Sequence, residues 1–322
     1  MNPRLARLLA VLAVACAPFA AATAAAPQLK TTPPGVYRMM LGDFEVTALS
    51  DGTVELPFLQ ILQKITQARA EAMLARQFLK DPVETSVNAF LINTGDKVVL
   101  IDTGAGTFFG PTLGRMLAAL KAAGYQPEQV DEIYISHMHG DHIGGLLADG
   151  KPAFPNAVVR AEKADGDFWL SQAKMNAAPK DKQDSFKGAM AAITPYAATN
   201  RFMPYEGDTV LVPGIRAVVT RGHTPGHAMY VIESKGEKLV LWGDLMHQAA
   251  VQFLDPSVTV VFDSDQSKAA QQRRQAYRAA AKEGHWVGAS HLPFPGIGHL
   301  RAEGKGYAYG PVNYTALPPA AK

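Results

Sequence analysis

Short apolar runs alternate with longer amphipathic segments along the first half of the chain. Residues 44–50, 86–93 and 97–104 are apolar runs of strand length, and each ends at a turn residue or a glycine. This pattern predicts strands. Residues 65–78 and 112–124 instead place apolar side chains at helical spacing among good helix formers, which predicts helices.

The second half continues this alternation, with one polar interruption. Residues 176–208 are polar with scattered proline and glycine, so we expect a surface insertion near an opening. Helical patterns occupy residues 167–175 and 266–284. The further predicted strands are residues 132–136, 157–161, 215–220, 227–234, 237–244 and 285–290. Two groups of strands with interspersed helices predict a single α/β domain in which one sheet packs on another and helices cover the outer faces.

The first 26 residues have a different composition from the rest. Arg4 and Arg7 precede the uncharged apolar stretch 8–20, and small residues fill positions 21–26. This order predicts a secretory signal peptide over residues 1–26, and therefore a periplasmic or secreted protein. The alternative is an N-terminal membrane anchor, for which the apolar stretch is short.

The rest of the chain is expected to form one folded body with short extensions. Residues 27–35 are a lead-in that ends in TTPPG, and residues 316–322 are a loose tail. The folded domain is expected to span residues 36–315.

Loss of the signal segment changes both the charge and the cysteine content. It reduces the 31 lysines and arginines to 29, against 29 acidic residues, so the mature net charge is close to zero. That balance argues against capture of nucleic acid or of an anionic membrane. Cys16, the single cysteine, is lost with the same segment, so the mature chain can form neither a disulfide nor a thiolate metal site. Any metal must be held by nitrogen and oxygen ligands.

The segment ISHMHGDHIGG, residues 135–145, gathers three imidazoles and a carboxylate at the end of a predicted strand. His137 and His139 are two residues apart and face the same side of an extended chain. After the turn at Gly140, Asp141 and His142 begin a new element and can point to a second place nearby. Ligands directed at two adjacent points suit two metal ions better than one.

Three later segments offer the further ligands that two ions need. His223 lies in a turn after a predicted strand, Asp244 ends the apolar run LWGD, and His291 follows the last predicted strand. Taken singly, a strand-terminal aspartate is more often a turn residue, and a lone histidine is more often part of a core. Their occurrence together, in matching contexts, predicts a metal site.

The segments HMHGDH, GHTPGH, GD and SH, in this order, resemble the ligand motifs of the metallo-β-lactamase superfamily. The similarity covers nearly all of residues 36–315. Strings such as FFGPTLGR and FPGIGHLRAEGKGY also resemble the branch of methyl parathion hydrolase and its lactonase-like relatives. The resemblance implies an αβ/βα four-layer sandwich of two mixed β-sheets flanked by helices, with the metals at the sheet edges, and it implies a homodimer.

The resemblance also assigns roles to residues of this chain. The implied ligands of one ion are His137, His139 and His223, those of the other are Asp141, His142 and His291, and Asp244 bridges the two ions. Asp102, in the segment IDTG, resembles the carboxylate that orients a ligating imidazole. We also expect His299 to hydrogen-bond near His291.

Two divalent ions that share a carboxylate usually share a hydroxide as well, and this hydroxide can attack an ester-like bond directly. Asp141 and Asp244 are then the catalytic carboxylates, acting with that bridging hydroxide. Imidazole and carboxylate ligands suit zinc first, with cobalt, manganese or iron as alternatives. No covalent enzyme intermediate is expected.

Aromatic residues near the predicted site suggest the kind of small-molecule substrate. Phe109, Trp169 and Phe186 are expected to line a pocket for an aryl group, although ordinary core packing is the competing interpretation. The resemblance also places His247, Leu62 and Phe262 at the substrate pocket, where Leu62 and Phe262 resemble the lactonase-type relatives. The imidazole of His247 and the ring of Phe262 at the rim would crowd a tetrahedral phosphotriester more than a flat carbonyl. This favours a lactone or aryl ester, such as dihydrocoumarin, with weaker turnover of aryl phosphotriesters.

Two other functions remain open on the sequence alone. One is a dedicated organophosphate hydrolase of the methyl parathion type, and the other is a non-catalytic exported metal-binding protein. Asp244 argues against a true β-lactamase, and the charge balance argues against a nuclease. Basic residues suited to gripping glutathione, as a glyoxalase-II-type thioesterase requires, are not evident.

Overall fold

The computed structural model describes residues 26–317 of the 322-residue chain. The expected signal peptide, residues 1–26, lies almost wholly outside the described residues, as does most of the expected tail. The chain divides into two units, Met1–Pro33 and Pro34–Lys322, and everything below concerns the second. Among the described residues, no helix combines the length and the apolar character needed to cross a bilayer.

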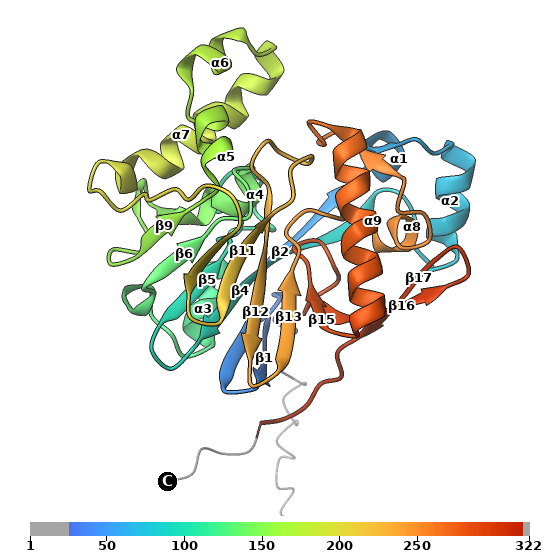
Figure 1. The fold of residues 1–322 in the computed structure, drawn as a ribbon, viewed down its shortest axis with the longest axis horizontal. Helices are drawn as coiled ribbons and strands as arrows, with labels where there is room; N and C mark the ends of the chain where they lie inside the picture. Colours follow the sequence, from blue (N-terminus) through green and yellow to red (C-terminus); the bar gives the residue numbers. More distant parts are fainter. Residues whose placement is uncertain (1–25, 318–322) are drawn as a thin grey trace, which may run out of the picture. The chain divides into compact units, whose positions relative to one another are not determined.

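The first sheet has six strands in the order β1-β2-β4-β5-β6-β9 (Figure 1). The first four strands pair antiparallel, whereas β5, β6 and β9 run parallel. Parallel strands end at the same edge of a sheet, so the loops that follow β5, β6 and β9 start from one edge. The strands are β1 (Val36–Leu41), β2 (Phe44–Leu56), β4 (Val83–Asn93), β5 (Val98–Ile101), β6 (Glu132–Tyr134) and β9 (Val158–Arg160).

The second sheet has seven strands in the order β10-β11-β12-β13-β15-β16-β17. All neighbours pair antiparallel except β13 and β15, which run parallel. Strands β11, β13 and β15 therefore point in the same direction and end at one edge. The strands are β10 (Thr209–Val212), β11 (Ile215–Val219), β12 (Ala228–Ser234), β13 (Glu237–Leu241), β15 (Trp286–Gly288), β16 (Ile297–Glu303) and β17 (Gly306–Pro311).

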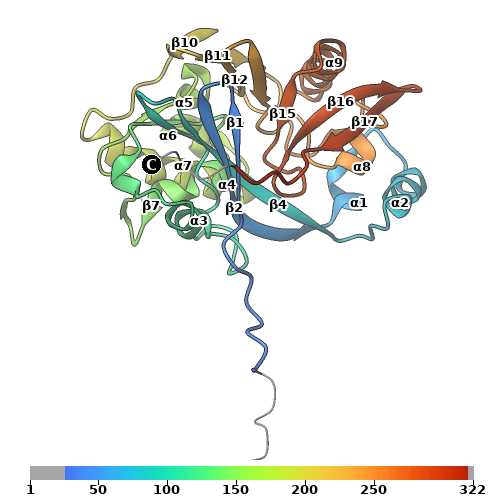
Figure 2. The ribbon, with the colours of Figure 1, turned by 90° about the horizontal axis from the view of Figure 1, so that it is seen from below.

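Helices cover the outer faces of both sheets, which gives four layers (Figure 2). Helices α3 (Met116–Ala122) and α7 (Gln183–Ala197) share a buried apolar cluster with the outer face of the first sheet. Helix α9 (Gln266–Glu283) does the same on the second sheet. The inner faces of the two sheets meet in a third cluster, which includes Phe90 and Tyr230. This arrangement confirms the predicted sandwich of two mixed sheets flanked by helices.

The remaining elements are short and lie mostly in connections. Strands β3 and β14 pair antiparallel, and so do β7 and β8. These elements are α1 (Phe58–Ile61), β3 (Leu62–Gln63), α2 (Gln67–Ala75), α4 (Gly140–Ile143), β7 (Leu147–Ala148), β8 (Lys151–Pro152), α5 (Lys163–Trp169), α6 (Gln172–Ala177), α8 (Ala249–Gln252) and β14 (Thr259–Val260).

Strand β2 is longer than the predicted strand at residues 44–50, because it continues through a bulge near Gly52. The bulge places the buried carboxylate of Asp51 against the loop after β5. There it accepts backbone N–H groups from Ala105, Gly114 and Met116, at 2.9, 3.0 and 2.9 Å. Asp51 therefore holds in place the loop that follows Asp102 and contains Phe109.

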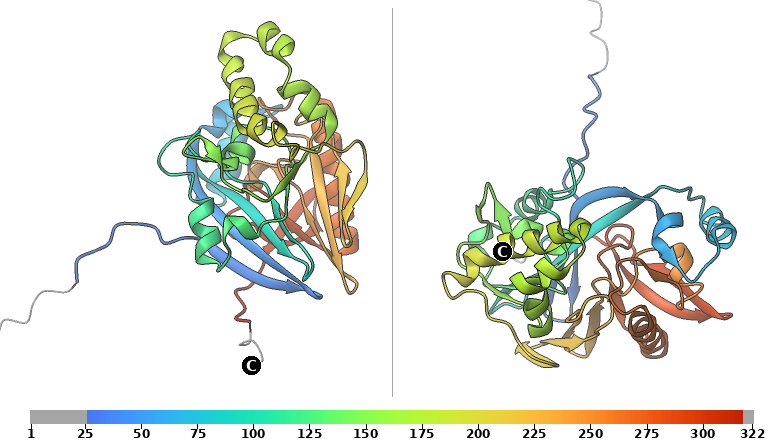
Figure 3. Two further views of the ribbon diagram at one scale, coloured as in Figure 1. Left: turned by 90° about the vertical axis from the view of Figure 1, so that its left-hand side faces the viewer. Right: turned by 90° about the horizontal axis from the view of Figure 1, so that it is seen from above.

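The prediction of a surface insertion at residues 176–208 is wrong for its central part. Helix α7 occupies this part and packs one face into the core, because small and aromatic side chains recur at helical spacing. Figure 3 shows α7 lying against the first sheet while α6 projects away from it. The buried residues of α7 are Phe186, Ala189, Ala192, Ile193 and Tyr196.

We expect the Tyr196→Phe substitution to lower the free energy of unfolding by about 1–3 kcal/mol, because it leaves the buried Phe154 N–H without a partner and leaves the Leu146 carbonyl only the Ala153 N–H. The Tyr196 hydroxyl donates to the Leu146 carbonyl at 2.9 Å and accepts from the Phe154 N–H at 3.2 Å. Urea denaturation would measure the change. Tyr314→Phe is the matched control, since Tyr314 is 85% exposed. Equal unfolding midpoints for both variants would contradict this role of the hydroxyl.

Candidate metal centre

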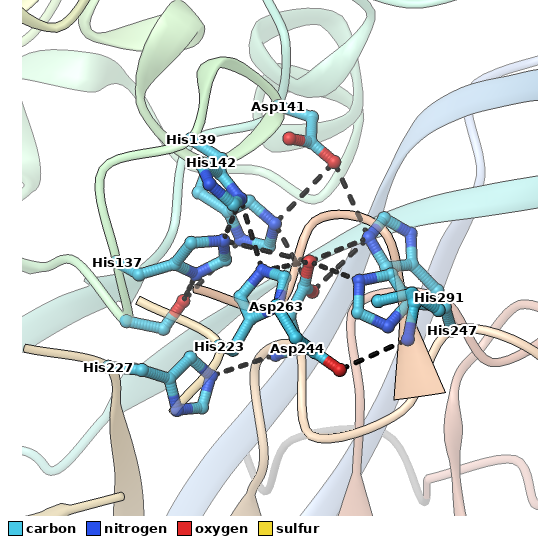
Figure 4. Close-up of polar contacts among 12 residues, drawn as sticks. His137, His139, Asp141, His142, His223, His227, Asp244, His247, Asp263 and His291 are labelled. Carbon is cyan, nitrogen blue, oxygen red and sulfur yellow. Dashed lines mark hydrogen bonds and ion pairs between the residues drawn. The ribbon is translucent and has the colours of Figure 1, made fainter. Parts of the chain in front are cut away.

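Loops from both sheets meet at the edge where β6, β11, β13 and β15 end. His137 and His139 follow β6, and His223 follows β11. Asp244 follows β13, and His291 follows β15. Together with Asp141 and His142 of α4, their donor atoms form two adjacent groups that share Asp244 (Figure 4). All seven residues predicted as ligands are therefore brought together.

The glycines after His142 allow this edge to close. A Cβ atom on Gly144 would lie 2.0 Å from the Ala105 carbonyl oxygen, and one on Gly145 would lie 1.9 Å from that of Thr103. Such distances exclude a side chain at either position. The loop after β5, which starts with Asp102, can therefore lie directly against the ligand segment.

The first group consists of His137, His139, His223 and Asp244. Nδ1 of His139 lies 3.0 Å from Nε2 of His137 and 3.0 Å from Nε2 of His223. Oδ2 of Asp244 lies 3.6 Å from the His137 nitrogen and 3.4 Å from the His223 nitrogen. Three imidazole nitrogens and one carboxylate oxygen thus face a common point, which is the donor set of a nitrogen-rich zinc site.

The second group consists of Asp141, His142, His291 and the same Asp244. Nε2 of His142 and Nε2 of His291 each lie 3.2 Å from Oδ1 of Asp244. Oδ2 of Asp141 lies 3.5 Å from the first of these nitrogens and 3.4 Å from the second. Asp244 therefore presents Oδ2 to the first group and Oδ1 to His142, whereas Nε2 of His291 lies 3.2 Å from both oxygens. One carboxylate thus reaches both groups, as a bridging carboxylate would.

Unpaired buried atoms show that these residues fit a bound metal. Within residues 26–317, Nε2 of His142 and Oδ1 of Asp244 are buried and form no hydrogen bond. A buried polar atom without a partner is costly, and coordination would remove this cost. Sulfur ligands are absent from both groups, so the donors suit zinc and its first-row neighbours.

Each group also contains an imidazole whose Nδ1, the nitrogen that does not face the group, pairs with a carboxylate. Nδ1 of His142 pairs with Oδ2 of Asp102 at 2.8 Å, and Asp102 in turn accepts from the backbone N–H and the hydroxyl of Ser136, both at 2.8 Å. Nδ1 of His223 pairs with Oδ1 of Asp263 at 2.9 Å. Such contacts fix the ring orientation and the tautomer. Asp102 thus lies where the sequence resemblance places it.

Asp263 and Asp165 were missed by the sequence reasoning. Asp165 is fully buried in α5, and its carboxylate accepts from the N–H groups of Met138 at 2.8 Å and Gly226 at 2.6 Å. It thereby joins the loop of His137 and His139 to the loop after His223. Neither aspartate lies next to a ligand in the sequence, so motif spacing gave no signal for them.

Two further histidines lie beside the ligands. Nε2 of His227 accepts from the backbone N–H of Asp244 at 3.0 Å, which fixes the main chain at that residue. His247 is buried, with Nε2 at 3.2 Å from Oδ2 of Asp244 and its ring stacked on His291 at 5.3 Å. His247 therefore lies at the candidate metal centre, buried beside Asp244 and not at an exposed rim.

The aromatic residues predicted to form a pocket differ in how far they are exposed to solvent. Phe109 and Phe262 are 50% and 40% exposed, and Trp169 packs edge-on against His139 at 5.3 Å. Phe186 is only 3% exposed and lies behind Trp169 at 4.8 Å, so it supports the indole from the core. Leu62 is likewise buried, in a cluster under α1 and β14.

The prediction for His299 is wrong. Its Nδ1 pairs with the His285 carbonyl at 3.2 Å, and its ring packs on Trp286 at 3.7 Å. Both partners lie at the start of β15, whereas His291 follows the end of that strand. The register of β15 against β16 therefore places His299 toward the opposite edge of the sheet from the candidate metal centre.

Without bound metal, burial lowers the pKa of some ligand imidazoles, whereas neighbouring carboxylates raise the pKa of others. Burial lowers the pKa of His139 to about 3 and that of His137 well below its usual value, so both rings are neutral at pH 7. Burial also opposes protonation of His291, but the carboxylates of Asp244 and Asp141 raise its pKa to about 10. The same two carboxylates and Asp102 hold the pKa of His142 well above its usual value.

We expect zinc binding at pH 7 to release protons from the second group, because His142 and His291 are protonated without metal and a ligand must be neutral. The first group already holds neutral His137 and His139. Apparent zinc affinity should therefore rise with pH by about tenfold per unit for each proton released. Calorimetry in buffers of different ionisation enthalpy would count these protons. Zinc binding without proton release would contradict the expectation.

A model of the metallo-β-lactamase superfamily matches residues 82–291 of the chain. Over 89% of this chain and 100% of the other, the chain is 39% identical to a hydrolase named AbOPH in the β-lactamase superfamily, with a TM-score of 0.84. It is 27% identical to AidC, a dizinc quorum-quenching lactonase, over 88% of this chain and 99% of AidC, with a TM-score of 0.81.

Curated relatives match over a shorter length. An N-acyl homoserine lactonase of Bacillus cereus is 29% identical over 171 residues, which are 47% of this chain and 60% of the relative. The chain thus spans less than two thirds of that lactonase. The family model covers well over half of the chain and includes all seven candidate ligands. The protein belongs to the metallo-β-lactamase superfamily.

Proposed function

We propose that this protein is a metal-dependent hydrolase with two zinc ions, and that its main substrates are lactones and aryl esters. The observation that carries the proposal is the position of Asp244, whose two oxygens face two complete ligand groups. The similarity to AidC and to the N-acyl homoserine lactonases supports a lactone as the substrate class.

The chain's own residues define what a bound pair of ions would do. His137, His139 and His223 would hold one ion, and Asp141, His142 and His291 the other, with Asp244 between them. When bound, the ions supply a water nucleophile that is active near neutral pH and polarise the carbonyl under attack.

The polar residues around the ligands keep the site rigid during the reaction. Asp102 pairs with Nδ1 of His142, and Asp263 pairs with Nδ1 of His223. These contacts fix both rings, so the ligands need not reorient when a substrate binds. His227 fixes the main chain of Asp244. Such preorganisation lowers the reorganisation needed to reach the transition state.

Apolar side chains beside the ligands favour a substrate with an aryl or acyl group. The exposed parts of Phe109 and Phe262 and the indole of Trp169 lie near the two ligand groups, where they can cover such a group. Burial of apolar surface contributes about 25 cal/mol per Å² to binding.

His247 and Phe262 favour a flat carbonyl over a phosphotriester. The imidazole of His247 lies 3.2 Å from Asp244, and the ring of Phe262 packs against it at 6.1 Å. The His247 ring thus lies directly beside the shared carboxylate, and Phe262 lies next to it. A tetrahedral phosphorus with three substituents needs more space there than a planar ester, so we place phosphotriester hydrolysis second. A dedicated organophosphate hydrolase is the alternative.

Export by a signal peptide at residues 1–26, a homodimeric state and a position close to methyl parathion hydrolase remain predictions from the sequence. Mass spectrometry of the protein recovered from its host would test the first, since a mature chain without residues 1–26 is expected. An intact N-terminus on the recovered protein would contradict it.

We expect the zinc-loaded protein to hydrolyse dihydrocoumarin with a higher kcat/KM than methyl parathion, because the rings of His247 and Phe262 restrict bulky substrates. Steady-state kinetics on one metal-defined preparation would measure both values, with an N-acyl homoserine lactone as a third substrate. A higher value for methyl parathion would favour the alternative of a dedicated organophosphate hydrolase.

We also expect removal of the metal to abolish this activity, because the bound ions would supply the activated water in the proposed reaction. Dialysis against a chelator should lower the rate at least 100-fold, of the order expected when an activated nucleophile is lost. Zinc or cobalt should restore it. The Asp244→Asn variant, which lacks the shared carboxylate, should be as inactive as the chelated protein without any chelator. A protein that binds two metals yet is inert toward lactones, esters and phosphotriesters would support the non-catalytic alternative.

A further inference from the structure

Arg273 is a buried arginine on the packed face of α9, and it contacts the loop that follows Asp244. The other buried residues of this helix are four alanines and Tyr277, so Arg273 is the one charged side chain on its packed face. Arg273 is 0% exposed. A buried guanidinium is costly unless its N–H groups and its charge are matched, so its contacts should explain its presence.

The first contacts of Arg273 are with main-chain carbonyls of two loops. Nε donates to the carbonyl of Leu245, the residue that follows the shared ligand Asp244. Nη1 donates to the carbonyls of Val258 and Pro256, which lie in the loop that leads to Asp263. One planar side chain therefore ties the loop of the shared carboxylate to the loop that supports His223.

The remaining nitrogen of Arg273 faces a carboxylate that supports a ligand. Nη2 lies 3.8 Å from Oδ2 of Asp263 and, within the described part of the chain, forms no hydrogen bond. The other oxygen of Asp263, Oδ1, pairs with Nδ1 of His223 at 2.9 Å. A chain of contacts thus runs from α9 through Asp263 to the imidazole that faces the first ligand group.

A second side chain meets Arg273 at the same carbonyl. Gln252 donates from Nε2 to the Val258 carbonyl at 3.0 Å, and its Oε1 accepts the backbone N–H groups of His247 and Gln248 at 2.7 and 3.0 Å. Arg273 and Gln252 therefore hold the two ends of the loop from Asp244 to Gln248, and both side chains donate to the Val258 carbonyl of the neighbouring loop. Arg273 holds the end that carries the ligand.

We propose that Arg273 is a positioning residue of the metal centre, which sets the separation of Asp244 from His223 through Leu245 and Asp263. This inference rests on the proposed metal site. Arginine suits the role because its planar fork presents five N–H donors on three nitrogens in a fixed geometry, whereas a lysine presents three donors on one flexible ammonium. A purely structural role, in which Arg273 only joins α9 to the second sheet, is the competing explanation.

The test measures zinc binding and the geometry of the metal ligands. We expect Arg273→Met to weaken zinc binding in one of the two groups by about 10–100-fold, the usual effect of losing a residue that supports a ligand. Competition with a chelator would measure this affinity, and the absorption spectrum of the cobalt-substituted protein should shift because the ligand geometry changes. Arg274→Met is the matched control, since Arg274 is the next residue of α9 and is exposed.

A double mutant separates positioning from general destabilisation. If Arg273 acts through Asp263, combining Arg273→Met with Asp263→Asn should weaken zinc binding little more than the stronger single substitution does. Additive losses of zinc affinity would overturn the link through Asp263. Arg273→Lys keeps the charge and provides a milder variant in case the methionine variant does not fold, and it should still lose zinc affinity and shift the cobalt spectrum.

The outcomes also separate this inference from the proposed function. A lower melting temperature with unchanged zinc affinity and an unchanged cobalt spectrum would show that Arg273 is structural only. If the unmodified protein itself retains no zinc, the metal site and the proposed function fail. If it retains two equivalents and so do the Arg273 variants, with equal affinity, only the inference about Arg273 fails.

Discussion

The carboxylate of Asp244 lies within 3.6 Å of five imidazoles, and the candidate site depends on that arrangement. Burial alone would favour the neutral acid, but the surrounding rings of His142 and His291 hold the pKa of Asp244 well below its usual value. An ionised carboxylate with two accessible oxygens can serve two cations at once. Removing it would leave three donors in each group and no ligand shared between the two groups.

This arrangement requires the whole sandwich. His137 and His142 come from the first sheet, whereas Asp244 and His291 come from the second. The two sets meet only because strands of each sheet end at a common edge and the inner faces pack against one another. The metal site can therefore form only after both sheets have formed and docked, and metal binding should stabilise their docking by mass action.

The ligands could be predicted from the sequence because they are carried by short local motifs at strand ends. Residues that support them from a distance could not, since Asp263, Asp165 and Arg273 join the site through contacts between elements far apart in the chain. Helix α7 was missed because alanines form much of its buried face and give a weak hydrophobic pattern. His299 was misplaced because sequence alone does not fix the register of the strand that carries it.

Helix α6 has no buried residue, and its main contacts are with its neighbours α5 and α7. It begins three residues after Trp169, the indole beside His139. Exchange or lengthening of residues 171–182 would therefore change the surface next to Trp169 while leaving every candidate ligand in place. This stretch carries no candidate ligand, so its length and sequence can change independently of the metal-binding segments.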